Sequence, residues 1–158
     1  MTDSPLLERA ARFVSALRHC QVLGIEVHAA NAEGMTLRLP YSPQIVGDPQ
    51  TGIIHGGALT SLMDTACGMA TLCVLPEFEV CPTLDLRIDY MHPAEPHKTV
   101  FGFAQCYRVT SDVIFTRGFA YQDDPQQPIA HVVGTFMRMG KRLKGTKGLG
   151  SSIKGEQA

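Results

Sequence analysis

The sequence is short of charge, and the charge it has is balanced. Charged residues make up 18% of the 158 residues, and 14 Lys and Arg against 15 Asp and Glu leave a formal net charge of -1. Such a chain has no global field to gather a polyanion, so we expect no nucleic-acid partner, and an acidic ligand must be held by a local site. Hydrophobic residues make up 44%, enough for one core in a chain too short for two. We therefore expect a single domain.

Metal-ligand spacings and long apolar runs are also missing. The cysteines are Cys20, Cys67, Cys73, Cys81 and Cys106. No two of them form a Cys-x-x-Cys pair, so we expect buried, reduced thiols and no zinc or redox site. The histidines show no His-x-x-x-His spacing, so no metal is expected. No run of about eighteen apolar residues occurs, and acidic Asp3 and Glu8 precede any apolar stretch, which predicts neither a membrane span nor a signal peptide. The expected protein is soluble and cytoplasmic.

Hydrophobic spacing predicts the helices and the first strands. Apolar residues recur at helical spacing after Ser4-Pro5 and predict a helix to about His19. Alternation over residues 23–28 and 35–39, around a turn at 31–34, predicts a hairpin. A proline-free run rich in Ala, Leu and Met, from Gly56-Gly57 to Leu75, predicts the one long helix after the first.

From Thr83 onward the hydrophobic period changes to two, which is typical of strands. Four strands are expected, at 83–90, 99–109, 113–121 and 129–139, with connections short enough for hairpins. This order predicts an α+β domain with an antiparallel sheet over residues 1–139. Residues 140–158 are rich in Gly and Lys, and we expect them to form a flexible basic tail.

The long helix has two unlike sides. Most of its surface is apolar, whereas a narrow strip holds small and polar residues. The strip consists of Gly57, Ser61, Asp64, Gly68 and Thr71. A single carboxylate among small neighbours leaves room for a ligand or another backbone to approach it. The alternative is a solvated Asp64, or one paired with an arginine such as Arg87.

Two glycines stand where this helix begins. The N–H groups of Gly56-Gly57 have no partner inside the helix, and with the helix dipole they can polarise a thioester carbonyl and hold the oxyanion formed on attack. Asp64 lies roughly 10 Å further along the helix, too far for one carbonyl to meet both groups on one helix. Two antiparallel helices in a homodimer would bring the Gly57 end of one against the Asp64 of the other. This interpretation therefore requires a dimer.

Three stretches together resemble a known family. They are His55-Gly56-Gly57-Ala58-Leu59 with Asp64, the segment TLDLRIDY at 83–90, and Pro93-Ala94. With these stretches, the chain resembles the hotdog-fold acyl-CoA thioesterases of the phenylacetic-acid-degradation (PaaI) type, which are 4-hydroxybenzoyl-CoA thioesterase-like. The resemblance extends over about residues 20–139. The resemblance implies the hotdog fold, a long central helix wrapped by a curled antiparallel sheet, here with an extra N-terminal helix. It implies hydrolysis of an acyl-CoA at the interface of a homodimer, often paired into a homotetramer. No cofactor is implied, since coenzyme A is part of the substrate.

The resemblance also implies roles for single residues. Asp64 matches the catalytic carboxylate, which acts as general base, the role we favour, or as nucleophile. Gly57 matches the residue whose N–H polarises the carbonyl. Thr83 falls where relatives carry a water-positioning hydroxyl, unless it is an ordinary strand threonine. His55 is expected to shape the turn by hydrogen bonding, with proton transfer as the alternative. Substrate contacts are expected from Gln50, Gly56, Ser61 and Gly68.

One position departs from the family pattern. Relatives carry an asparagine six residues before the histidine, and this chain has Pro49 there, with Gln50 or Asp48 as substitutes. Loss of an oxyanion donor can reduce the rate about 100- to 1000-fold. This departure keeps open a non-catalytic acyl-CoA-binding or regulatory module on the same fold. A hotdog dehydratase is disfavoured because the His-Phe-Pro-Gly turn of such enzymes is absent. The acyl group, and coenzyme A or a carrier protein as the thiol, stay open.

Overall fold

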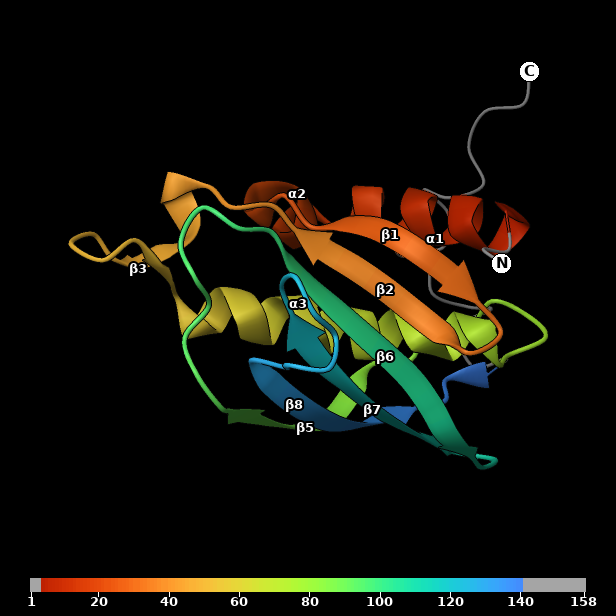
Figure 1. Ribbon diagram of the computed structural model, residues 1–158. Helices are drawn as coiled ribbons and strands as arrows, with labels where there is room; N and C mark the ends of the chain where they lie inside the picture. The colour runs from red at the N-terminus through yellow and green to blue at the C-terminus, as the bar shows by residue number, and fades with distance from the viewer. Residues whose placement is uncertain (1–3, 141–158) are drawn as a thin grey trace, which may run out of the picture.

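One helix lies in the hollow of a curled sheet in the computed structural model, which describes residues 4–140 (Figure 1). The helices are α1 (Ser4–Ala16), α2 (Arg18–Leu23) and α3 (Gly56–Ala70), with short 3-10 turns η1 (Pro43–Ile45) and η2 (Thr71–Cys73). The strands are β1 (Glu26–Asn31), β2 (Gly34–Leu39), β3 (Val46–Asp48), β4 (Ile53–Ile54), β5 (Thr83–Tyr90), β6 (Val100–Val109), β7 (Val113–Tyr121) and β8 (Ala130–Met137). The predicted α+β arrangement is confirmed.

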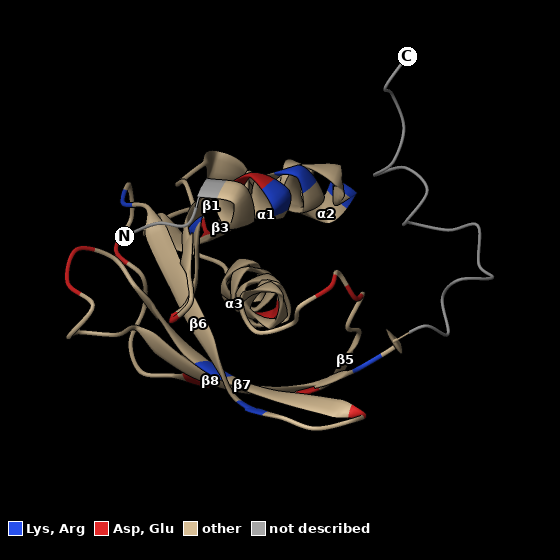
Figure 2. Cartoon of the chain, turned by 90° about the vertical axis from the view of Figure 1, so that its right-hand side faces the viewer, with Lys and Arg blue, Asp and Glu red and all other residues tan. Residues whose placement is uncertain are grey.

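Six of the strands form one antiparallel sheet in the order β1-β2-β6-β7-β8-β5, and β3 pairs with β4 separately. The strand that follows α3 in the chain, β5, therefore lies at an edge of the sheet, paired with β8 alone. Viewed along α3, the sheet curves around two sides of the helix, α1 and α2 cover a third, and the chain leading into β5 passes the fourth (Figure 2).

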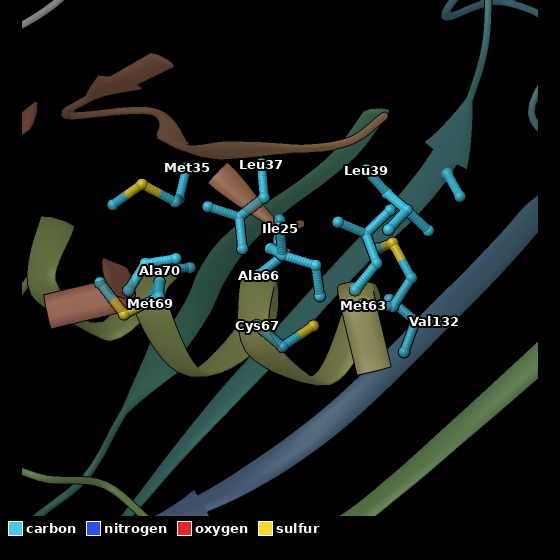
Figure 3. Packing of buried hydrophobic residues seen from close by; sticks show 14 of the residues in the cluster. Ile25, Met35, Leu37, Leu39, Met63, Ala66, Cys67, Met69, Ala70 and Val132 are labelled. Carbon is cyan, nitrogen blue, oxygen red and sulfur yellow. The ribbon is translucent and has the colours of Figure 1, made fainter. Parts of the chain in front are cut away.

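The core lies between the apolar side of α3 and the concave face of the sheet. Met63 and Ala66 point from α3 into a layer that includes Leu37 of β2, whereas Cys67 points to the other side of the helix (Figure 3). The helix approaches β6 closely because residue 102 is glycine: a Cβ there would lie 2.8 Å from the sulfur of Met63. One buried cluster runs from Leu6 of α1 to Phe136 of β8.

The predicted N-terminal helix is wrong in one respect, because it is two helices. The backbone of Leu17 is extended, with φ -81° and ψ 110°, so α1 ends at Ala16 and α2 continues to Leu23. This turn directs Cys20 into the core, where 2% of its surface is exposed. Gly24 ends α2 in the left-handed conformation at φ 72°, which glycine adopts without strain.

Two smaller expectations also need correction. The long helix was expected to reach Leu75, but regular α-helix ends at Ala70 and a 3-10 turn continues to Cys73. The cysteines were expected to be buried, but of the five only Cys20 and Cys67 are fully buried. The predicted basic tail, apart from Gly140, lies outside the described residues. Within residues 4–140, no helix combines the length and the apolar run needed to cross a bilayer.

Candidate active site

The polar strip of α3 contacts β5 through Thr83 and α2 through His19. Gly57 is exposed, and Ser61, Asp64 and Gly68 are half-buried. Thr71, in contrast, is buried, and its hydroxyl donates to the carbonyl of Gly68 at 2.7 Å. The open part of the strip is therefore Gly57 to Gly68.

Asp64 is held by a strand hydroxyl. The Thr83 Oγ1 donates to Asp64 Oδ1 at 2.8 Å, across 19 residues of sequence. The pairing of β5 with β8 shifts register between Thr83 and Asp85, so the strand is irregular at the point where it meets the helix. Among the described residues, the second carboxylate oxygen, Oδ2, has no hydrogen-bond partner. Arg87 pairs with Asp89 at 2.9 Å, so the alternative pair between Asp64 and Arg87 is not formed.

The helix begins with a histidine cap. The His55 Nδ1 accepts the Gly57 N–H at 2.9 Å, and the His55 carbonyl accepts the Ala58 N–H at 2.9 Å. The local hydrogen bonding expected of His55 is thus present. It also engages the Gly57 N–H, the group that sequence reasoning assigned to the carbonyl of the substrate. Among hydrogen bonds between residues 4–140, none uses the Gly56 N–H, so Gly56 is the better-placed donor.

Tyr90 fixes the position of Gly56. The Tyr90 hydroxyl donates to the Gly56 carbonyl at 2.7 Å and lies 2.6 Å from the Thr60 hydroxyl, which also donates to the Gly56 carbonyl at 3.1 Å. The far end of β5 therefore holds the start of α3, as Thr83 at its near end holds Asp64. One strand positions both groups of the candidate site.

Sequence reasoning did not identify Tyr90, Thr60 or His19 as parts of this region. His19 Nε2 of α2 lies 3.1 Å from Ser61 Oγ, which itself donates to the Gly57 carbonyl at 3.0 Å. Tyr90 and Gly56 are 34 residues apart, and His19 and Ser61 are 42 apart. The period of β5 indicated that Tyr90 shares a face with Ile88, but no spacing along the chain indicates which group a hydroxyl will reach.

The two possible substitutes for the missing asparagine differ in what they contact. Asp48 accepts the Thr51 hydroxyl at 2.7 Å and the Gln50 N–H at 3.0 Å, and these hydrogen bonds lower the pKa of its carboxyl. Asp48 therefore stabilises its own turn. The exposed Gln50 side chain makes no hydrogen bond within the described part of the chain, so it remains free for a substrate.

Cys67, close to Asp64 along the helix, is unsuited to act as a nucleophile. Burial, and secondarily the nearby Asp64 carboxylate, raise the pKa of Cys67 to about 12, so the group stays a neutral thiol at neutral pH. Across residues 4–140, no three His, Cys, Asp or Glu side chains gather where a metal ion could be held. The polar groups nearest to Asp64 in the described structure include the hydroxyl of Thr83 and, further along the strip, that of Ser61.

Known proteins are similar to this chain in sequence. The family profile described as the thioesterase superfamily matches residues 51–129. The medium/long-chain acyl-CoA thioesterase YigI of Escherichia coli K12 is 30% identical over 140 residues, which are 79% of this chain and 88% of that protein. A Halobacterium salinarum protein is 37% identical over 75 residues, so the match spans only 50% of its length.

Two solved structures show the same architecture. A Pseudomonas aeruginosa protein that is 76% identical superposes with a TM-score of 0.79, over 85% of this chain and 100% of that one. The PaaI protein of the Escherichia coli phenylacetic acid degradation operon superposes with a TM-score of 0.71 at 18% identity, over 85% of this chain and 96% of that one.

A long helix wrapped by a curled antiparallel sheet, with one carboxylate on the open side of the helix, defines a protein of the hotdog class. The chain belongs to the thioesterase superfamily, and it is a thioester hydrolase.

Proposed function

We propose that the protein hydrolyses an acyl-CoA to the free acid and coenzyme A, with Asp64 as the general base. The main supporting observation is that α3 has one carboxylate, Asp64, on its open strip, with one oxygen held by Thr83. The free Oδ2 removes a proton from water as the water oxygen attacks the thioester carbon. The carbon–sulfur bond then breaks, and the proton passes to the sulfur of coenzyme A. The name of YigI supports a medium- or long-chain acyl group.

In this proposal, Thr83 positions the carboxylate, and a backbone N–H polarises the carbonyl. The sequence pointed to the Gly57 N–H, but its bond to His55 favours the N–H of Gly56. Residues 56 and 64 are about 12 Å apart along one α-helix, so the donor belongs to the partner subunit of a homodimer. The exposed edge of β5 supports association there.

The remaining parts of the proposal follow the sequence. Ser61, Gly68 and the free side chain of Gln50 contact the substrate, and the reaction needs no cofactor or metal because water is the second reactant. The dimers pair further into tetramers, and the protein works in the cytoplasm without nucleic-acid or membrane partners.

The first test is thiol release from short, medium, long and aromatic acyl-CoAs by the wild type and by Asp64→Asn. Loss of a general base is expected to lower kcat at least about a hundredfold while the folded dimer and acyl-CoA binding persist. Binding without turnover by the wild type would instead favour the non-catalytic acyl-CoA-binding module, the function that Pro49 leaves open.

The second test asks whether each site is shared between subunits. Gly56→Pro removes the N–H at the first helical position, where proline is tolerated, while Gly56→Ala adds a Cβ but keeps the N–H. Either Cβ would lie 3.3 Å from the Tyr90 hydroxyl, so the two variants carry the same steric change there. We expect Gly56→Pro to lose far more activity than Gly56→Ala.

Mixing Asp64→Asn with Gly56→Pro then restores activity if the sites are shared. Random exchange makes half of the dimers mixed, and each mixed dimer has one intact site of two, so about a quarter of the wild-type activity is expected. If no activity returns although the subunits exchange, the donor and the base belong to the same subunit.

A further inference from the structure

A cavity adjoins the open strip of α3 beyond Asp64. Its volume is about 90 Å³, and its walls come from α1, from the second half of α3 with η2, and from the chain between η2 and β5. The wall residues used below are Phe13, Leu17, Thr65, Gly68, Phe78 and Val80. The three segments are far apart in sequence, so the cavity exists only in the folded chain.

The cavity lies next to the position of the proposed reaction. Thr65 follows Asp64 directly, and Gly68 lies one helical turn, roughly 6 Å, further along the same strip. A thioester carbonyl at Asp64 therefore has the glycine end of the partner helix on one side and this cavity on the other. An acyl chain that leaves the carbonyl along α3 enters the cavity within about one turn of the helix.

Gly68 lines the cavity without a side chain. It lies inside α3, where glycine is less favourable than alanine by about 1 kcal/mol, and its φ is not positive. A Cβ at this position would lie 3.4 Å from the Phe136 ring, an ordinary contact, so packing does not require glycine either. The absent side chain leaves space on the wall of the cavity.

Two aromatic rings face each other in the wall of the cavity. Phe13 of α1 and Phe78 before β5 lie with ring centroids 5.4 Å apart, and 38% of Phe78 is exposed. Arg9 ties α1 to this region by donating to the Leu72 carbonyl at 3.2 Å. This part of the wall is thus built by the extra N-terminal helix and one loop.

Resting on the proposed acyl-CoA hydrolysis, we propose that this cavity receives the end of a linear acyl chain, and that the Phe13–Phe78 pair limits the length of that chain. A flexible alkyl chain fits better than a ring, because an apolar protein cavity of about 150 Å³ accommodates benzene and this one is smaller. Each methylene buried in such a cavity favours binding by about fourfold. Preference therefore rises with chain length until the chain meets the two rings.

The test compares kcat/KM for butanoyl-, octanoyl- and tetradecanoyl-CoA. Phe78→Ala opens the end of the cavity and is expected to raise the ratio of tetradecanoyl to octanoyl turnover at least about tenfold. Gly68→Val narrows it and is expected to lower the ratio of octanoyl to butanoyl turnover by a similar factor. The matched control is Val74→Ala, since Val74 is 40% exposed on the same segment but does not line the cavity. Val74→Ala is expected to change kcat/KM for the three substrates by the same factor. If Phe78→Ala and Gly68→Val do the same, the proposal is wrong.

A binding measurement separates this proposal from the proposed function. Calorimetric titration of the wild type, Phe78→Ala and Gly68→Val with S-alkyl-CoA thioethers, which cannot be hydrolysed, reports the chain-length dependence of Kd without turnover. If no acyl-CoA is hydrolysed but Kd shows the expected shifts, the cavity stands and the hydrolysis proposal falls. If Kd does not depend on chain length in any of the three proteins while hydrolysis occurs, the cavity proposal is wrong and the proposed hydrolysis is unaffected.

Discussion

At the scale of single residues, two hydroxyls of β5 organise the proposed active site. Thr83 donates to Asp64, and Tyr90 donates to the carbonyl of Gly56. Both contacts join the strand to α3, so a shift of β5 along the helix would disturb the base and the oxyanion donor together. The strand therefore acts as a single positioning element.

Thr83→Val replaces the hydroxyl with a methyl group of similar size and leaves Asp64 without its donor. A hydrogen bond to a charged group contributes about 1.5–3 kcal/mol, so we expect kcat to fall about 10- to 150-fold if this contribution is lost in the transition state, in a variant that circular dichroism shows to be folded. Thr83→Ser keeps the hydroxyl and serves as the control. Equal kcat for the valine and serine variants, measured by thiol release, would show that this hydroxyl has no part in positioning Asp64.

Sequence reasoning selected Asp64 and the Gly57 N–H, whereas the proposal above assigns the contact with the carbonyl to the Gly56 N–H. The strip of small residues around Asp64 follows from helix geometry, which fixes residues on a face. The choice between Gly56 and Gly57 depends on the ring of His55, whose orientation no sequence period specifies. The period of β5 places Tyr90 on the same face as Leu86 and Ile88, yet its bond to Gly56 depends on the approach of two distant segments.

At the scale of elements, an ion pair pins the segment between η2 and β5. Arg138, just after β8, donates to Glu79 at 2.6 Å and 3.3 Å, and the two side chains are 24% and 13% exposed. The hydrogen bonds from Arg138 hold the pKa of Glu79 below its usual 4.5. The same segment includes Phe78, so this pair stabilises the outer wall of the cavity.

Glu79→Gln is expected to lower the free energy of unfolding by about 1–2 kcal/mol at neutral pH. Because the folded pKa is lowered, the contribution of Glu79 is complete above about pH 4.5 and is lost as the pH falls through the folded value. The difference between wild type and variant should therefore shrink in acid. Urea unfolding at neutral and acid pH measures this difference in the free energy of unfolding, and Glu77→Gln, at an exposed position, is the control. If the difference between wild type and Glu79→Gln does not depend on pH, this ion pair is not its cause.

The elements themselves were predicted unevenly. Strands β5 to β8 follow from alternation, and their limits agree closely with the predicted ranges. The break at Leu17 was missed because apolar spacing continues across it, and a single extended residue leaves no period of its own. The break allows Cys20 to be buried, and such a tertiary contact has no signal in the local sequence.

At the scale of the whole molecule, the strand order has one feature that local patterns do not indicate. The chain crosses from α3 to the far edge of the sheet at β5, and β6 returns to pair with β2. Hydrophobic period predicts strands but not their neighbours, so the sequence indicated an antiparallel sheet without this order. The consequence is that β5, which holds the proposed site, has one unpaired edge.

We expect this edge to bind a second copy of the chain. Leu84 of β5 is 50% exposed in the single chain, and Leu84→Lys should convert dimers to folded monomers and reduce activity. Val22→Lys, on α2 where Val22 is 69% exposed, is the matched control and should stay dimeric. Molecular mass from light scattering, with circular dichroism for folding, measures both. If the two variants have the same mass as the wild type, the subunits associate elsewhere.

The contact between α1 and the segment after η2 also orders events during synthesis. At roughly 5–20 residues per second, the ribosome needs about 3–12 s to extend the chain from the end of α1 to Phe78, the partner of Phe13. Because every residue passes through the same exit tunnel, α1 also emerges from the ribosome that much earlier than Phe78, and during the interval it lacks part of the surface that it covers. The first helix to be translated is therefore fully packed only after the segment that carries Phe78 has emerged.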